Sequence, residues 1–204
     1  MQTTRLIAQE IVPGPDRNLI YWAGFMGSDG ELFGRLIGRK LRVRPIHLGS
    51  ATFVQLADMP DVEELCEGFL RSLGYEGICG IELKIDERDG TGKLIEVNAR
   101  YGLWEDIGVP VGVDLVRDAV TAATGGTPIP RRPSSFSQKW IHLRSDIGAF
   151  LDYRSEDSLN LVDWITSLRP PILVNDFPLL SDVKYSLHNL KMILRSIRAR
   201  SKKN

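Results

Sequence analysis

The stretch ICGIELKIDERDGTGKLIEVNAR, residues 78–100, contains the clearest strand-turn-strand pattern in the chain. Two runs of strand-forming residues, 78–86 and 93–99, lie on either side of an Asp89-Gly90 turn signal. Such a pattern is typical of two antiparallel strands joined by a tight hairpin. The segment is therefore expected to form the hairpin around which the rest of the sheet is arranged.

One face of this hairpin is polar, because side chains alternate between the two faces of a strand. The side chains predicted on this face are Glu82, Lys84, Asp86, Glu96, Asn98 and Arg100. With the turn at Asp89-Gly90, Glu82 falls across the ladder from Glu96. Two carboxylates in facing positions repel each other and destabilise a sheet. A cation between them would remove that repulsion, and carboxylate and amide oxygens are the ligands that Mg²⁺ prefers.

Glu82, Glu96 and Asn98 are therefore the candidate metal-binding group. On spacing alone, a second interpretation is equally open: a solvated polar face of a half-exposed antiparallel sheet, because Glu-x-Asn patterns are short and common.

Further strands and helices are predicted on both sides of the hairpin. The strands are expected over 6–12, 18–26, 31–43 and 51–56, and the helices over 60–73, 113–124, 159–168 and from about 178. Asp58 is the expected N-cap of the helix 60–73, and Gly74 its expected end. These elements predict an α/β (α+β) fold, an antiparallel sheet with packed helices, in residues 1–126. Residues 127–204 are expected to form a linker, Pro- and Ser-rich over 127–137, and a helical extension.

The last predicted helix has the clearest apolar stripe in the chain. Its members are Val183, Leu187, Leu190, Leu194 and Ile197, spaced by four, three, four and three residues. The stripe is expected to pack on the domain, and packing on another chain is the second interpretation.

Composition excludes several classes of function. The 204 residues contain 26 Lys and Arg against 26 Asp and Glu, so no overall charge favours a nucleic acid or a membrane surface. Cys66 and Cys79 have no metal-ligand spacing and are expected to be buried thiols in a reducing compartment. No signal peptide or membrane span is evident, which predicts a soluble, cytoplasmic protein.

Two segments resemble the ATP-grasp family, in particular the carbamoyl-phosphate synthase large subunit and the amino-acid ligases. They are LRSLGYEGICGIELKID, residues 70–86, and KLIEVNAR, residues 93–100. In that family, an acidic residue on the first strand and a Glu-x-Asn on the next bind the metal ions that bridge the nucleotide phosphates. The resemblance implies this role for Glu82, Glu96 and Asn98.

The family's Glu-x-Asn-Pro-Arg arginine corresponds to Arg100, where it would meet a phosphate or a substrate carboxylate. Ala99 replaces the usual proline. A surface ion pair is the second interpretation of Arg100.

Two further segments resemble parts of the same family. IAQEIVPGPD, residues 7–16, resembles the strand that follows the adenine-side hinge, which would place Glu10 near the adenine and Asp16 near the ribose hydroxyls. GRKLRVRP, residues 38–45, resembles a strand whose basic residues face the triphosphate, here Lys40 and Arg42. The alternative for Glu10 and Asp16 is that they are acidic residues of a turn at the end of a strand. The alternative for Lys40 and Arg42 is that they lie on a basic outer strand that binds no ligand.

The resemblance implies an ATP-dependent carboxylate-amine (or thiol) ligase that uses Mg²⁺ and ATP and acts on small carboxylate and amine substrates. The sequence begins near the adenine hinge, so the N-terminal lobe is expected from elsewhere, with the chain a fragment, a split-gene subunit that needs a separate chain, or a remnant. Weak nucleotide binding and little turnover are expected for this chain alone. The alternatives are a degenerate module that binds a nucleotide or a partner without catalysis, and a structural sheet domain with a fortuitous Glu-x-Asn.

Overall fold

A computed structural model of the protein describes residues 8–174, 184, 187–188 and 191–192. Its elements are η1 Asp16–Asn18, β1 Leu19–Met26, β2 Leu32–Arg44, β3 Ser50–Leu56, α1 Pro60–Ser72, β4 Gly77–Ile85, β5 Gly92–Asn98, η2 Glu105–Val111, α2 Leu115–Ala123, β6 Lys139–Ile141, α3 Leu143–Ser155, α4 Leu161–Ser167 and β7 Ile172–Val174. The seven strands form one sheet in the order β5-β4-β1-β2-β3-β6-β7. Neighbouring strands are antiparallel except β6 and β7, which are parallel. The expected α/β fold with a mostly antiparallel sheet and packed helices is confirmed.

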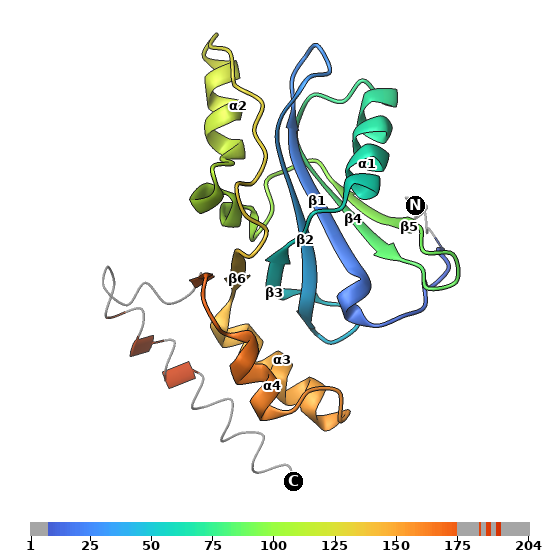
Figure 1. Ribbon diagram of the computed structural model, residues 1–204, viewed down its shortest axis with the longest axis vertical. Helices are drawn as coiled ribbons and strands as arrows, with labels where there is room; N and C mark the ends of the chain where they lie inside the picture. The colour runs from blue at the N-terminus through green and yellow to red at the C-terminus, as the bar shows by residue number, and fades with distance from the viewer. Residues whose placement is uncertain (1–7, 175–183, 185–186, 189–190, 193–204) are drawn as a thin grey trace, which may run out of the picture.

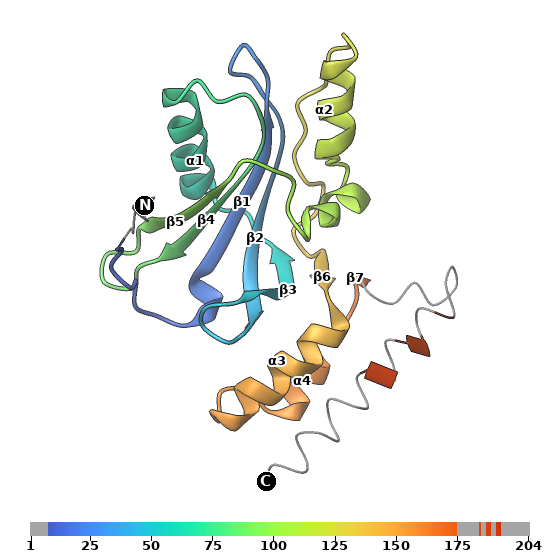
Figure 2. The same ribbon diagram turned by 180° about the vertical axis from the view of Figure 1, so that it is seen from behind.

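The sheet has an apolar core on each face, and β1 contributes to both. Every residue of β1 is buried. Ile20 and Trp22 point to the face that α1 covers, where they pack with Leu70 of the helix. Tyr21, Ala23 and Phe25 belong to the core of the opposite face, which includes residues of η2 and the start of α2. Figures 1 and 2 show α1 and α2 on either side of the long strands, and α3 with α4 beyond one end of the sheet.

Most predicted elements lie within a few residues of the observed ones. Gly74 ends α1 in a left-handed conformation, with φ +59°, as expected. The predicted N-cap was wrong by one position, because α1 is preceded by Met59, which makes no side-chain cap. None of the described helices is both long and apolar enough to cross a membrane.

The predicted strand over residues 6–12 is wrong for its described part, since 8–15 has no regular structure. The side chains from Ala8 to Ile11 are all exposed, so this segment has no buried face that would fix it as a strand of the sheet.

The sheet continues beyond residue 126. Lys139–Ile141 pairs with β3, Ile172–Val174 pairs with β6, and α3 lies against β2 and β3. These three elements were not predicted, because two are only three residues long and the third has no strong apolar stripe. The division at 126/127 stays a prediction. The stripe of the last predicted helix lies outside the described residues, except for Leu187, whose side chain is exposed.

A buried ion pair joins α3 to the sheet. Arg42 of β2 donates from Nε to Asp146 Oδ1 at 2.7 Å and from its second amino group to Oδ2 at 2.8 Å. Asp146 is fully buried and also accepts from Thr52 and from the indole nitrogen of Trp164. The carboxylate therefore accepts four hydrogen bonds, and they come from three residues on β2, β3 and α4.

Replacing Arg42 by Met is expected to destabilise the protein by about 3–5 kcal/mol, because it leaves the Asp146 carboxylate buried without its cation. Urea unfolding would measure the free energy. Arg39→Met is the matched control, because the Arg39 side chain is only part-buried and donates to the Arg17 carbonyl, and it should cost about 1 kcal/mol or less. Equal losses in the two variants would contradict this assignment.

Candidate functional site

A cavity of about 750 Å³ lies over the polar face of the hairpin. Its floor comes from β1, β2, β4 and β5, and its rim from residues 9–12 and from the β2–β3 connection. Of the residues predicted to form a site, those that line it are Glu10, Lys40, Glu82, Glu96, Asn98 and Arg100. Asp16 and Arg42 do not line it. Sheet pairing brings together five of these side chains, and the irregular segment 8–15 adds Glu10.

The predicted pairing of Glu82 with Glu96 is observed, and the register then shifts by one residue at a bulge between Glu82 and Leu83. Glu82 of β4 pairs with Glu96 of β5, and on the other side of β4 it pairs with Tyr21 of β1. Asn98 pairs with Gly80, one step along the same face. Glu96 is exposed, whereas Glu82 and Asn98 are partly buried. Two carboxylates and one amide oxygen therefore line one stretch of the cavity floor.

Lys40 provides the positive charge nearest to this group. Its side chain is 6% exposed, and Nζ lies 2.6 Å from Oε2 of Glu82. To reach Glu82 it extends across β1, where Nζ lies 5.9 Å from the centre of the Tyr21 ring. The pair neutralises Glu82 within the protein, and among the described residues Glu96 has no such cation.

Arg100 lies at one end of the cavity with its guanidinium largely uncommitted. The side chain is exposed, and its recorded hydrogen bond is to the carbonyl of Tyr101, at 3.3 Å. An arginine free of carboxylates can still bind a carboxylate or phosphate in bidentate fashion.

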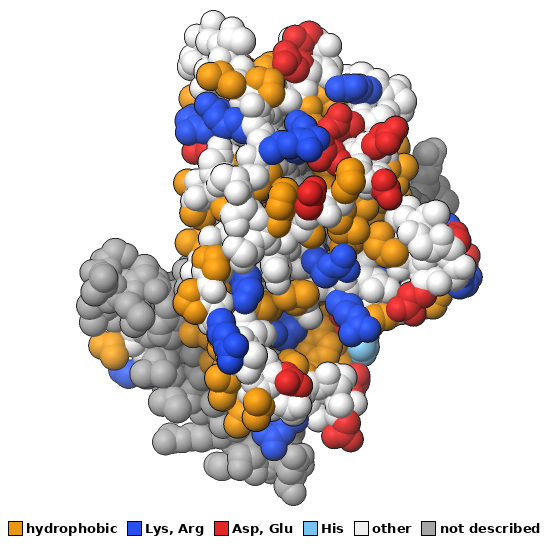
Figure 3. Space-filling model, viewed as in Figure 1, with side chains coloured by type: hydrophobic (Ala, Val, Ile, Leu, Met, Phe, Trp, Pro, Cys, Tyr) orange, Lys and Arg blue, Asp and Glu red, His pale blue; other side chains and the backbone are white. Residues whose placement is uncertain are grey.

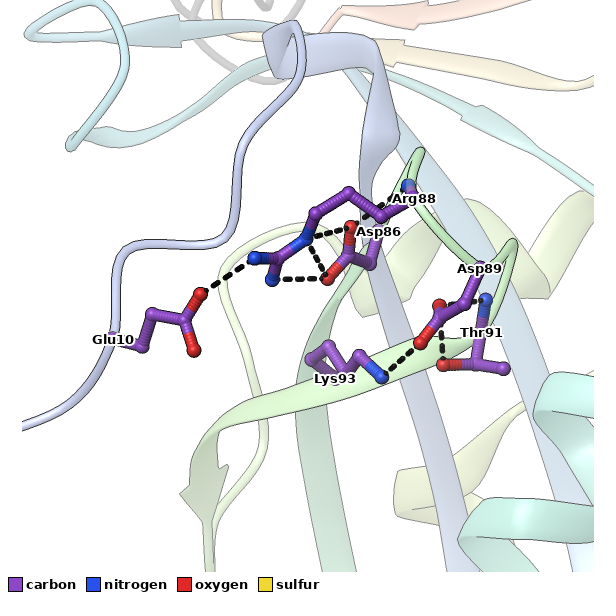
Figure 4. Close-up of polar contacts among 6 residues, drawn as sticks. All are labelled: Glu10, Asp86, Arg88, Asp89, Thr91 and Lys93. Atoms are coloured by element: carbon purple, nitrogen blue, oxygen red, sulfur yellow. Dashed lines mark hydrogen bonds and ion pairs between the residues drawn. The ribbon is translucent and has the colours of Figure 1, made fainter.

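Glu10 forms part of the rim and is held by the hairpin. Arg88 donates to its Oε1 at 2.8 Å and also pairs with Asp86 at 2.6 Å (Figure 4). Hydrogen bonds from Arg88 lower the pKa of Asp86. The acid predicted near the adenine is therefore at the cavity, but its carboxylate is partly satisfied by Arg88.

Asp16 and Arg42 are engaged elsewhere. Arg42 holds α3 through Asp146 as described above. Asp16 is 5% exposed, and it accepts from the Tyr153 hydroxyl and from the His47 backbone at 3.1 Å. Hydrogen bonding to Asp16, and then to Glu156, raises the pKa of His47. Through His47, Asp16 supports the β2–β3 connection that forms the cavity rim.

Glu105 is a functional candidate that sequence reasoning missed. Its side chain is 1% exposed, Oε1 accepts from the Tyr21 hydroxyl at 3.2 Å, and Oε2 has no hydrogen-bond partner among the described residues. Burial raises the pKa of Glu105 to about 7, despite opposing hydrogen bonds from Gly102 and Tyr21 and the charge of Arg100. No motif marks this residue, because only the packing of η2 against β1 buries it.

The glycine at position 80 makes this contact possible. A Cβ there would lie 1.7 Å from the Tyr21 hydroxyl oxygen, so any larger residue would displace the Tyr21–Glu105 pair.

Glu105→Gln should stabilise the protein at pH 8 by roughly 2–3 kcal/mol and leave it nearly unchanged at pH 4. The folded-state pKa is raised, so the favourable protonated form is fully present below about pH 4.5, and its contribution is lost as the pH rises through about 7. Thermal unfolding from pH 4 to pH 8 measures the difference. A gain that does not vary with pH would show that the charge of Glu105 is not its cause.

The donor set at the cavity suits a hard divalent cation. Glu82, Glu96 and Asn98 offer only oxygen ligands, and the facing carboxylates are a repulsive arrangement that a cation relieves. Within the described ranges, no group of three or more His, Cys, Asp and Glu side chains could hold a metal ion. Two carboxylates and one amide suit Mg²⁺ that is shared with phosphate oxygens and water.

The two glutamates should respond oppositely to neutralisation in metal-free protein. Glu96→Gln removes a like charge and should raise stability by about 0.5–1 kcal/mol. Glu82→Gln leaves the buried Lys40 without its carboxylate and should lower stability by about 1–3 kcal/mol. Chemical unfolding in EDTA would distinguish them, and a loss in both variants would contradict the repulsion between the glutamates.

Lysine and arginine side chains are interspersed with acidic and apolar ones over the face shown in Figure 3. This distribution agrees with the balanced composition, in which basic and acidic residues are equal in number.

No family model matches the chain. It is similar to a D-aspartate ligase of Enterococcus faecium (strain Aus0004), with 29% identity over 163 residues, 76% of this chain and 38% of that protein. The chain thus spans little more than a third of the relative's length. This similarity confirms the resemblance to ATP-grasp carboxylate-amine ligases.

Solved structures give weaker likenesses. A Campylobacter jejuni biotin carboxylase has a TM-score of 0.46, 18% identity, and coverage of 57% of this chain and 27% of that chain. The ATPase subunit of phosphoribosylaminoimidazole carboxylase from Aquifex aeolicus has a TM-score of 0.46, 13% identity, and coverage of 57% and 37%.

Proposed function

Because the chain is related to the ATP-grasp carboxylate-amine ligases, we propose that it supplies the Mg-ATP-binding surface of an ATP-dependent carboxylate-amine (or thiol) ligase. The observation that carries the proposal is the facing pair Glu82 and Glu96 on a cavity floor that also presents Asn98. Like charges in register, lined up at a cavity, are unfavourable without a ligand. A cation and its phosphate ligands would make the arrangement favourable.

In this reaction class, a carboxylate oxygen attacks the terminal phosphorus of ATP and releases ADP. The nucleophile then attacks the acyl carbon and releases inorganic phosphate. When bound, Mg²⁺ would neutralise charge on the phosphates. No covalent nucleophile is needed, so the protein contributes position and charge.

The chain's own residues have distinct roles in the proposal. Glu82, Glu96 and Asn98 would hold the metal. Lys40 keeps the Glu82 carboxylate fixed through the 2.6 Å pair and adds positive charge to the phosphate region. Arg100 orients an anionic group, either a phosphate or the carboxylate of the acid substrate. Glu10 limits the cavity at the rim, where its second oxygen would accept a hydrogen bond from the nucleotide base.

The substrates are proposed from the relative. A D-aspartate ligase suggests a small amino acid as the carboxylate substrate and an amine as its acceptor. The chain corresponds to 38% of that protein, so we propose that further protein, in the same polypeptide or a separate chain, completes the substrate site. Alone, the chain should bind nucleotide weakly and turn it over little.

A second candidate function is a non-catalytic module that binds a nucleotide or a partner. The Lys40–Glu82 pair favours it, because this pair already neutralises one of the two facing carboxylates without a metal. A module of this kind would bind ATP without Mg²⁺, whereas the proposed ligase surface would bind ATP only together with Mg²⁺.

Calorimetric titration of ATP into the chain, with and without Mg²⁺, tests the proposal. Binding is expected near millimolar Kd with Mg²⁺, and Glu96→Gln should weaken it about tenfold, because a charged metal ligand is lost.

Glu64→Gln is the matched control for that titration, since Glu64 is exposed on α1, which covers the opposite face of the sheet, and it should bind as the wild type does. Equal binding by Glu96→Gln and wild type, or binding that is independent of Mg²⁺, would favour the non-catalytic module. No heat at 10 mM ATP would remove nucleotide binding from this chain.

A further inference from the structure

Lys84 is a cavity residue to which neither motif nor resemblance gives a role. It lies on β4, two residues beyond Glu82 and on the same face, and it lines the cavity. Its register partners are Leu19 of β1 and Lys93 of β5. The side chain is partly buried.

Three of the other basic side chains at the cavity are paired with carboxylates. Lys40 pairs with Glu82 at 2.6 Å, Arg44 with Asp152 at 3.4 Å, and His47 with Asp16 at 3.2 Å. Arg100 donates to a backbone carbonyl. Over the described ranges, the ammonium group of Lys84 makes no hydrogen bond or ion pair.

The position of Lys84 is unfavourable in the absence of a ligand. Its cross-strand partner is another lysine, and facing like charges destabilise a ladder. Lys93 is neutralised by Asp89 at 2.6 Å, across the turn (Figure 4). In the part of the chain that the structure describes, Lys84 has no such carboxylate, and the neighbouring lining residues Leu19 and Leu94 are apolar. The Lys84 side chain is partly buried, and within the described ranges no carboxylate lies at ion-pair distance to offset its charge.

The charges form an ordered series along the hairpin. Arg100 lies beyond Asn98 at one end, the facing pair Glu82 and Glu96 lies in the middle, and Lys84 lies at the other end. Two uncommitted cations therefore flank the acidic pair. Such a series suits ligands that present an anionic group at each end, with a cation between them.

We propose that Lys84 binds an anionic oxygen group, a phosphate or a carboxylate, of the ligand that occupies this cavity. The inference rests on the proposed function only for the nature of that ligand. Lys84 is a binding residue, and the chemistry it recognises is a compact anion at the end of the cavity opposite Arg100.

The experiment titrates sodium tripolyphosphate and, separately, D-aspartate into the metal-free chain, the variant Lys84→Met and the control Lys93→Met. Both variants lose one cation at facing positions, so long-range electrostatic effects are nearly the same. Lys93 does not line the cavity. Lys84→Met should weaken one of the two anions roughly five- to tenfold, as expected for the loss of a charge-assisted hydrogen bond, and Lys93→Met should weaken it less than twofold.

The anion whose binding is weakened in Lys84→Met shows whether Lys84 binds a phosphate or a carboxylate. Weaker tripolyphosphate binding assigns Lys84 to the phosphates, and weaker D-aspartate binding assigns it to a substrate carboxylate. Equal affinities in Lys84→Met and Lys93→Met, or no binding of either anion to the wild type at 10 mM, would overturn the proposal. Because no metal is present, these results are independent of the Mg²⁺ and Glu96 dependence that tests the proposed function.

A second measurement covers the case in which Lys84→Met does not fold. Lysines of the wild-type chain are reductively methylated with ¹³C, and the Lys84 resonance is identified by its absence in Lys84→Arg. This resonance should shift on addition of the anion while that of Lys93 stays fixed. A stationary Lys84 resonance would contradict the proposal.

Discussion

The pairing of β1 with β2 on one side and with β4 on the other is the constraint on which the rest of the structure depends. Every side chain of β1 is buried, so its alternation must satisfy two apolar cores at once. Ile20 and Trp22 fill the core under α1, which leaves Tyr21 on the opposite face. A shift by one residue would exchange these sets. The fixed register then places Glu82 beside Tyr21 and allows Lys40 to reach Glu82 across β1.

The electrostatics of the cavity follow from this arrangement. Glu82 has a cation inside the protein. Among the described residues Glu96 has none, and Lys84 and Arg100 have no carboxylate partner. The cavity lining holds three glutamates and four lysine or arginine side chains, and these charges are divided along its length. A site built in this way depends on ligands to pair its remaining charges, which is consistent with a chemistry of phosphates, carboxylates and a metal ion.

The hairpin was predictable because it is local. Alternation and one turn signal sufficed to pair Glu82 with Glu96, and the same face contained Asn98 and Arg100. The roles of Arg42 and Asp16 could not be judged in this way, because their partners Asp146 and Tyr153 lie more than a hundred residues away. The sequence alone does not distinguish a basic residue that binds a phosphate from one that forms a buried ion pair with a helix. Burial against a carboxylate distinguishes them.

By itself, the sequence determined the strands of the hairpin, their register and the type of chemistry that their polar face permits, because period-two alternation and turn residues act over a few positions. Only the tertiary structure decided which charges remain available. It buried Glu105 beneath Tyr21, used Arg42 to attach α3 and joined β6 and β7 to the sheet. It also left Lys84 without an ion-pair partner among the described residues. Desolvation and ion pairing depend on neighbours that are distant in the chain, and only folding brings those neighbours together.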